Sequence, residues 1–135
     1  MSQEQPTAAG SEWRSNVMAG LCLLTLVVSL VRDLFIPETR NVEVWFGFEV
    51  TGTAALVTAP IHWAIFATGA WAFWSRKPWI WPAAAGYLLY GAFAHLVWSE
   101  ASANGRGWMI GLVQAFAIST MAMLVLRMRP PHRHP

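Results

Sequence analysis

Two histidines and several carboxylates lie in or beside long uncharged stretches, where ionisable side chains are costly. Glu49 precedes the uncharged residues 50–74, and Glu100 follows the uncharged residues 78–99. His62 and His95 lie inside these two stretches. Ionisable groups within a membrane are candidates for function. A carboxylic acid in an apolar setting can donate a proton, and a histidine or second carboxylate can accept one, so the pattern indicates acid–base chemistry.

We expect Glu49 to be the principal acid and His95 its nearest histidine partner, because both fall near one membrane level on adjacent antiparallel helices. The aromatic residues around Glu49 are expected to raise the pKa of its carboxyl group. His62 lies deeper in the bilayer. The other candidates are two catalytic carboxylates and six substrate-binding side chains: Glu100 and Asp33; Trp63, Tyr87, Tyr90, Trp98, Gln114 and Thr58.

These side chains also have structural interpretations. Glu49 and Glu100 at helix ends can simply be solvated. A neutral His62 can bond to a backbone carbonyl that Pro60 leaves free in the same helix. Hydroxyl and amide groups, as in Thr58 and Gln114, commonly join helices within membranes. The sequence leaves both interpretations open.

The composition is that of a membrane protein. Hydrophobic residues make up 56% of the 135 residues and charged residues 12%, about half the charge of a typical soluble domain. The net charge is +2, but the basic residues form no patch interleaved with aromatic residues, which argues against nucleic-acid binding. Cys22 is the only cysteine and excludes an intrachain disulfide. We predict no metal site and no cofactor.

The chain is expected to be all-α, an antiparallel bundle of four transmembrane helices over residues 12–128. Residues 1–11 are a predicted disordered tail and residues 129–135 a basic tail. The expected helices cover residues 13–35, a second span beginning near Trp45 or Val50 and ending at Trp74, and residues 78–99 and 107–126. The second and third helices, joined by a short basic turn, are expected to pack as neighbours.

Helical phase and charge give the expected faces and orientation. At ~100° per residue, one face of the third helix carries residues expected to point inward: Tyr87, Gly91, Ala94, His95 and Trp98. Six basic residues fall on one side of the membrane and three on the other: Arg14, Arg76, Lys77, Arg127, Arg129 and Arg133 against Arg32, Arg40 and Arg106. The positive-inside rule then predicts that both termini are cytoplasmic.

The order of several short segments resembles the EXPERA superfamily, which includes emopamil-binding protein and the sigma-2-type sterol-binding receptors. The segments are Glu49-Val50-Thr51, Ala59-Pro60-Ile61-His62-Trp63, Arg76-Lys77-Pro78, Tyr90-Gly91 and Trp98-Ser99-Glu100. Asp33 is similar to the aspartate that ends the first helix of the four-helix branch. The resemblance covers roughly residues 33–126 and is one of feature order, with no specific motif.

The resemblance implies a cavity open to the bilayer that takes a flat, mostly apolar ligand such as a sterol or isoprenoid. It also implies an isomerase or cyclase that protonates an alkene, or a binding protein with the same cavity. Two further hypotheses stay open: a b-type haem protein with His62 and His95 as axial ligands, and an accessory subunit of a larger membrane complex. The sequence leaves open whether the chain forms a homodimer.

Overall fold

The computed structural model describes residues 8–36 and 41–130. The predicted tail up to residue 7, the basic residues Arg40 and Arg133, and the C-terminal tail from residue 131 lie outside the described residues. Four helices account for most of the rest: α1 (Ala8–Phe35), α2 (Thr53–Trp74), α3 (Ile80–Ala101) and α4 (Trp108–Met128). α1 begins five residues before the predicted start, and α2 continues through Pro60.

Each helix contains a segment long and apolar enough to cross a membrane: Glu12–Phe35, Thr53–Trp74, Ile80–Ala101 and Trp108–Met128. At about 1.5 Å per residue, the 22 residues of α3 span roughly 33 Å, slightly more than the hydrocarbon core. Most large apolar side chains on the helix surfaces are exposed, as lipid-facing residues must be. The chain is a small integral membrane protein, and the predicted four-helix transmembrane class is confirmed.

A two-stranded antiparallel hairpin, which was not predicted, precedes α2. Strands β1 (Val42–Trp45) and β2 (Phe48–Thr51) pair with Trp45 opposite Phe48. Phe46 and Gly47 connect them with φ of 53° and 88°, the two positive values that a tight two-residue hairpin turn requires. The expected helix start near Trp45 or Val50 is therefore wrong, because valines and aromatic residues alternate here with the period of a strand.

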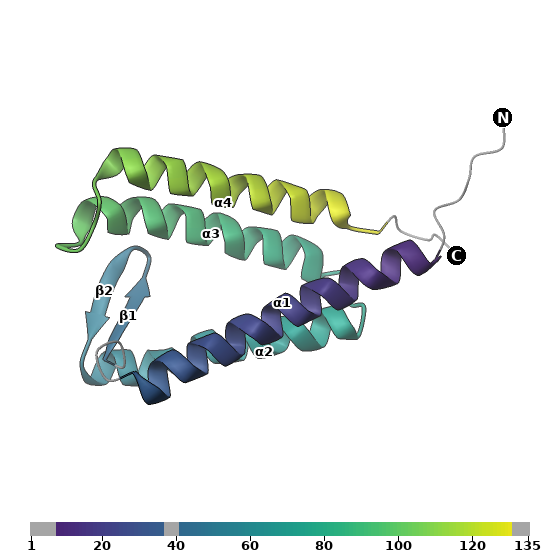
Figure 1. Ribbon diagram of the computed structural model, residues 1–135, viewed down its shortest axis with the longest axis horizontal. Helices are drawn as coiled ribbons and strands as arrows, with labels where there is room; N and C mark the ends of the chain where they lie inside the picture. The colour runs from purple at the N-terminus through teal and green to yellow at the C-terminus, as the bar shows by residue number, and fades with distance from the viewer. Residues whose placement is uncertain (1–7, 37–40, 131–135) are drawn as a thin grey trace.

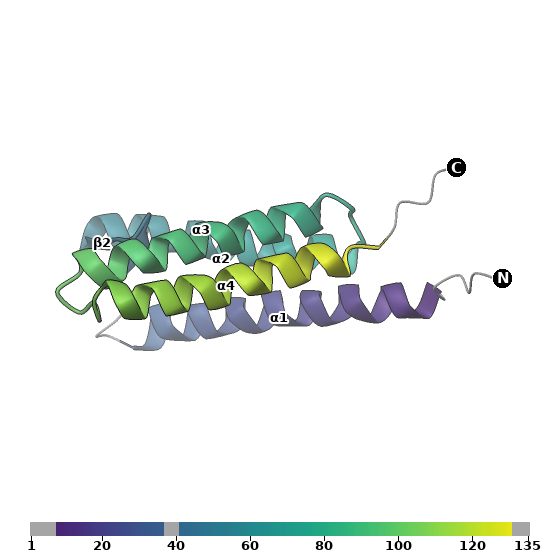
Figure 2. The same ribbon diagram turned by 90° about the horizontal axis from the view of Figure 1, so that it is seen from above.

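The helices are arranged in two layers. α1 packs along α2, and α3 packs along α4, whereas the backbones of α2 and α3 come close only near their connecting turn (Figures 1 and 2). The layers diverge toward the other end, where the hairpin stands between α2 and α3 (Figure 1). The expected close packing of α2 against α3 along their length is not found, because each helix has a better-fitting neighbour in its own layer.

The buried core lies at the end where the layers converge. Phe73 is fully buried and meets Trp81 edge to face, with ring centroids 5.1 Å apart. Small residues from α1, α3 and α4 complete this cluster: Ala19, Ala85 and Ala122. An ion pair of 2.9 Å between Arg76 and Glu12 places the start of α1 beside the α2–α3 turn. The core fixes the two layers at one end only, so the hairpin sets their separation at the other.

The hairpin turn is predicted to depend on Gly47. A β-carbon at Gly47 would lie 2.6 Å from Val97 Cγ1 and 2.8 Å from the Ala94 carbonyl oxygen on α3. Gly47→Ala should therefore lower the free energy of unfolding by about 2 kcal/mol or more, from overpacking and a left-handed alanine. Thermal unfolding followed by tryptophan fluorescence measures the loss. Gly91→Ala on α3, where a β-carbon meets nothing within 4 Å, is the control and should be neutral. Equal midpoints for both variants would contradict this role of Gly47.

Candidate functional site

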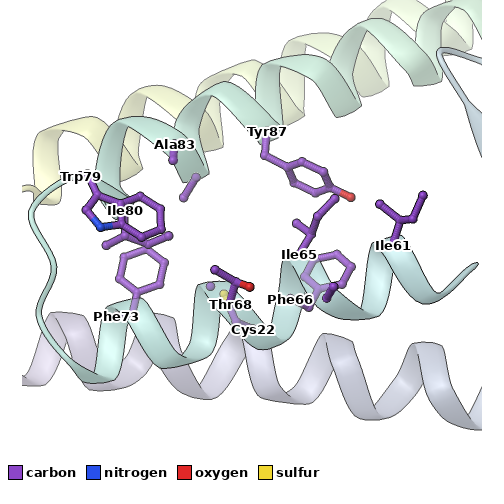
Figure 3. A pocket seen from close by; sticks show the side chains of 13 residues that line it. Cys22, Ile61, Ile65, Phe66, Thr68, Phe73, Trp79, Ile80, Ala83 and Tyr87 are labelled. Carbon is purple, nitrogen blue, oxygen red and sulfur yellow. The ribbon is translucent and has the colours of Figure 1, made fainter. Parts of the chain in front are cut away.

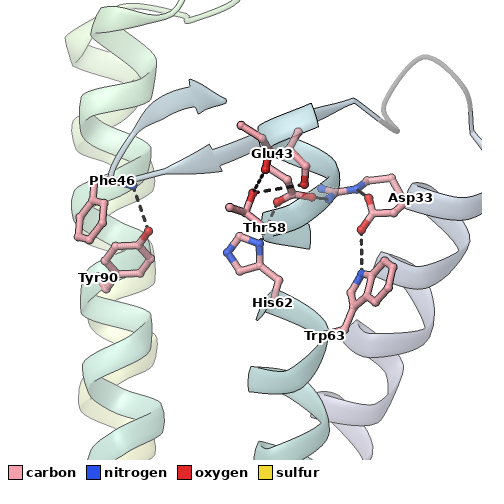
Figure 4. Close-up of polar contacts among 10 residues, drawn as sticks. Asp33, Glu43, Phe46, Thr58, His62, Trp63 and Tyr90 are labelled. Carbon is pink, nitrogen blue, oxygen red and sulfur yellow. Dashed lines mark hydrogen bonds and ion pairs between the residues drawn. The ribbon is translucent and has the colours of Figure 1, made fainter. Parts of the chain in front are cut away.

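A buried network of charged and polar side chains joins α1, β1 and α2. Glu43 on β1 is 4% exposed and accepts from Arg32 Nη2 at 2.6 Å through Oε1. Its second oxygen, Oε2, lies 2.8 Å from His62 Nδ1 on α2. Arg32 also contacts Asp33 Oδ1 at 2.6 Å, and Asp33 Oδ2 accepts from Trp63 Nε1 at 2.9 Å (Figure 4). All four carboxylate oxygens are thus engaged by protein side chains.

The pairing with Glu43 fixes the chemistry of His62. A carboxylate only accepts hydrogen bonds, so Nδ1 carries the hydrogen and Nε2 is an acceptor in the neutral ring and a donor in the charged ring. Trp45 stacks on the His62 ring, with centroids 4.3 Å apart and planes 9° from parallel. Nε2 makes no hydrogen bond with a described residue and lies on the side of the ring that faces α3 and Tyr90 (Figure 4).

The hairpin tip reaches deep between the layers. Tyr90 Oη accepts a hydrogen bond of 3.0 Å from the backbone N–H of Phe46, and their rings meet edge to face at 5.3 Å. Tyr90 is eleven residues before the end of α3, roughly 16 Å along the helix axis. The Tyr90 hydroxyl therefore gives this backbone N–H a partner, which a donor that lies within a membrane needs. The hairpin is held to α2 by Glu43 and to α3 by Tyr90.

An apolar cavity of about 350 Å³ lies between the two layers, on the core side of the hairpin. Its walls come from α1, α2 and α3, including Cys22, Ile65, Phe73 and Ala83 (Figure 3). Thr68 and Tyr87 are among its few polar side chains. The Tyr87 hydroxyl points toward Ile61, at the hairpin end of the cavity, and has no hydrogen-bond partner among the described residues (Figure 3).

A run of aromatic contacts leads from this cavity to the hairpin. Phe66 on α2 meets Tyr87 on α3 edge to face at 5.8 Å, and Tyr87 lies 5.8 Å from Tyr90. Tyr90 in turn contacts Phe46 at the hairpin tip. Of the polar residues at this end, Tyr87 lines the cavity, Tyr90 lies beyond it toward the hairpin, and His62 follows the lining residue Ile61 on α2. We call Tyr87, Tyr90 and His62 together the polar end of the cavity.

The structure corrects the expected role of Glu49. This residue is exposed on β2, where its Oε1 accepts from Ser102 Oγ at 2.6 Å and from Trp98 Nε1 at 2.9 Å. The bond from Ser102 and then that from Trp98 lower the pKa of Glu49, which is the opposite of the expected rise. The carboxyl group is therefore ionised near neutral pH and is not a ready proton donor. Its two partners replace His95, the partner that was predicted.

His95 and Glu100 are both exposed on α3, so the inward position expected for His95 is wrong. His95 forms no hydrogen bond or ion pair with a described residue. His95 is exposed because α3 packs along α4 and not along α2, so a different face of α3 is covered from the one expected. His62 and His95 therefore have no shared environment of the kind that the haem hypothesis needs.

The other predicted residues fall into three groups. Asp33, His62 and Trp63 belong to the buried network, while Tyr87 and Tyr90 form part of the polar end of the cavity. Gln114 Oε1 accepts from Ser99 at 3.4 Å between α3 and α4, and Thr58 donates to the carbonyl of Ala54 on its own helix. These contacts of Gln114 and Thr58 agree with a structural role for both side chains.

Sequence reasoning missed Glu43, Arg32 and Trp45 as site residues. Glu43 stands in the segment Val-Glu-Val-Trp, which was interpreted as a polar connection leading into a helix. The available signal was the alternation on both sides of Phe46-Gly47, which is typical of a hairpin. In strands of period two, Glu43 and its cross-strand partner Val50 share a face, and Glu49 must point to the other. The hairpin therefore buries Glu43 and exposes Glu49.

No family model, no curated protein and no solved structure matches this chain. The site is therefore interpreted from its own geometry.

The contrast between the two glutamates gives a stability prediction. Glu43→Gln replaces one acceptor oxygen with a donor nitrogen that must face either Arg32 or the Nδ1–H of His62. Because the group is buried, we expect the free energy of unfolding to fall by about 3 kcal/mol. Glu49→Gln is the matched control, and its unfolding midpoint at pH 7 should stay within experimental scatter of the wild type. A larger loss for Glu49→Gln than for Glu43→Gln would contradict the assignment of the buried network.

Proposed function

We propose that the protein binds an elongated, mostly apolar lipid of the sterol or isoprenoid class in the cavity between α2 and α3. The observation that carries the proposal is the apolar cavity of about 350 Å³, which ends at the hydroxyl of Tyr87. Ligand pockets commonly have volumes of this order, with apolar walls and a few polar groups that fix orientation. The order of features that resembles the EXPERA superfamily supports the same class of ligand.

The location of the cavity favours a lipid over a water-soluble ligand. All its lining residues except Trp79 belong to the membrane-spanning parts of α1, α2 and α3. A ligand there is surrounded by hydrocarbon and apolar side chains, so it must leave water before it binds. In this proposal the ligand lies along α3 with its polar end toward Tyr87, Tyr90 and His62. Asp33 and Trp63 act on it only indirectly, by holding the network that positions His62.

The orientation in the membrane is part of the proposal. The start of α1, the α2–α3 turn and the end of α4 lie at one end of the molecule (Figure 1). Basic residues are concentrated there, which supports cytoplasmic termini under the positive-inside rule. The hairpin and the polar end of the cavity then lie in the half of the membrane away from the cytoplasm.

Filling the cavity should abolish lipid binding. Ala83 lines the cavity, whereas Ala117 is exposed on α4 outside it. Ala83→Phe is expected to reduce at least tenfold the amount of lipid that stays with the purified protein, because the ring occupies the ligand's space. Extraction of the purified protein followed by mass spectrometry measures that amount. Ala117→Phe adds the same ring toward the bilayer and should retain wild-type lipid. Equal retention in both variants would contradict binding in this cavity.

Acid–base catalysis on the bound lipid is a second candidate function. The observation that favours it is the Glu43–His62 pair, in which a buried carboxylate holds an imidazole whose other nitrogen faces α3. In an alkene isomerisation, His62 would deliver a proton from Nε2 to one alkene carbon and take up a proton lost from the carbon next to the cation. The double bond moves, and the imidazole returns to its starting state. Glu43 stabilises the charged ring.

Solvent deuterium tests this second function. Protein reconstituted in liposomes in D₂O, with a ring-unsaturated sterol or squalene as probe, should place deuterium in the recovered lipid. His62→Gln should slow incorporation by about a hundredfold, because the amide can bond to Glu43 but transfers no proton. His95→Gln is the control and should keep the wild-type rate. If the wild type incorporates no deuterium into either probe, catalysis of this kind is excluded for them, while the binding proposal is unaffected.

A further inference from the structure

We propose that the polar end of the cavity selects an uncharged hydroxyl group, so that the ligand is a lipid alcohol and not a lipid amine or a fatty acid. The inference rests on the proposed lipid-binding function and specifies the end group of the ligand. The choice of a hydroxyl group follows from two observations. The carboxylate oxygens near this end already have hydrogen-bond partners, whereas the Tyr87 hydroxyl and His62 Nε2 have none among the described residues.

A lipid amine finds no free carboxylate oxygen here. Glu43 offers Oε1 to Arg32 and Oε2 to His62, while Asp33 offers Oδ1 to Arg32 and Oδ2 to Trp63. Both carboxylates are at most 5% exposed. An ammonium group brought to the polar end would lose its hydration and could not reach either carboxylate directly, because both are buried behind their partners Arg32, His62 and Trp63. That loss of hydration is costly in a medium of low dielectric constant.

A fatty acid is disfavoured by the charge of the same network. Two carboxylates and one guanidinium carry a net charge of −1 when His62 is neutral and zero when His62 is protonated. The network is positive in neither state. Arg32 already binds both carboxylates, so the guanidinium is occupied as a site for an incoming anion. A carboxylate ligand would therefore meet repulsion or, at best, no attraction.

The open positions suit a hydroxyl group. The Tyr87 hydroxyl and His62 Nε2 have no hydrogen-bond partner among the described residues. Tyr90 Oη accepts from Phe46 N–H, which leaves its own hydrogen to donate. A lipid hydroxyl can accept from a tyrosine and donate to the Nε2 of a neutral His62, or accept from Nε2 of a charged His62. An ether or a hydrocarbon cannot satisfy both kinds of partner.

Four probes of equal chain length test the inference: geranylgeraniol, its methyl ether, geranylgeranylamine and the corresponding hydrocarbon. Cys22 is the only cysteine and lines the cavity, so protection of its thiol from a small membrane-permeant thiol reagent reports occupancy. Each probe is titrated into nanodiscs that contain the full chain, and its concentration is expressed as the mole fraction in the bilayer. We expect half-protection by the alcohol at a mole fraction about tenfold lower than for the hydrocarbon or the ether.

Two isosteric variants locate the selectivity. Tyr87→Phe removes the hydroxyl at the polar end and should bring the alcohol to the level of the hydrocarbon, while the hydrocarbon itself is unchanged. Thr68→Val removes another cavity hydroxyl, which lies farther from the hairpin (Figure 3), and should keep the tenfold preference. The unchanged affinity for the hydrocarbon also shows that Tyr87→Phe still folds with its cavity intact.

The outcomes separate this inference from the function on which it rests. Equal protection by all four probes would overturn the choice of a hydroxyl and leave lipid binding in place. Tightest protection by the amine would also overturn it, because a carboxylate would then contact the ligand. If no probe protects Cys22 at any mole fraction, the lipid-binding function fails and the inference fails with it. A tenfold preference that Thr68→Val loses and Tyr87→Phe keeps would place the end group elsewhere and refute the inference.

Discussion

The burial of the Glu43 carboxylate at membrane depth is the constraint on which the rest of the structure depends. A charge in this position is costly unless it is paired and fully hydrogen-bonded. Glu43 meets the requirement with Arg32 from α1 and His62 from α2. Arg32 also donates to Asp33, and Asp33 accepts a second hydrogen bond from Trp63. One buried carboxylate thus fixes the end of α1, the hairpin and the middle of α2 relative to one another.

The hairpin, held in this way, prevents the helices from closing into a uniformly packed bundle. The layers converge on the core around Phe73 and Trp81 and are kept apart at the other end by the hairpin. A pair of strands is an unusual element at this depth because its backbone groups need partners. The cross-strand bonds pair the backbone groups on the facing edges of the two strands, and Tyr90 provides a partner for Phe46. The cavity is a consequence of this geometry, since it lies where the layers have begun to separate but the hairpin does not reach.

The four helices could be predicted because membrane insertion depends on the composition of each segment alone. Long uncharged stretches, short polar turns and interfacial tryptophans suffice to locate them. The pairing of helices could not be predicted in the same way. α2 and α3 are joined by a short turn, yet α2 packs on α1 and α3 on α4. Helical phase predicted which residues of α3 share a face, but it could not predict which helix packs against that face. His95 was therefore expected to point inward, although it is exposed.

The site was predictable only in part, for a similar reason. His62, Tyr87 and Tyr90 are polar groups within apolar helices, so their positions in the sequence were enough to predict them as site residues. Glu43 gave no such signal, because it lies in a polar connection between spans. Glu49 was predicted to be the principal acid because of its aromatic neighbours, but strand alternation directs its side chain outward to Trp98 and Ser102. The strand register decides which of Glu43 and Glu49 is buried. A helical interpretation of the segment does not contain that register.

In the proposed function, the Glu43–His62 contact links stability to ligand recognition. The same carboxylate that anchors the hairpin determines which nitrogen of His62 carries a hydrogen, and so what the other nitrogen can offer to a ligand. Substitutions in this network therefore change the separation of the helix layers and the polar end of the cavity together, and their effects should not add independently. Tyr87 is different because its hydroxyl has no structural partner among the described residues. In the proposed function, Tyr87 is the position where a substitution changes ligand recognition and leaves the fold the same.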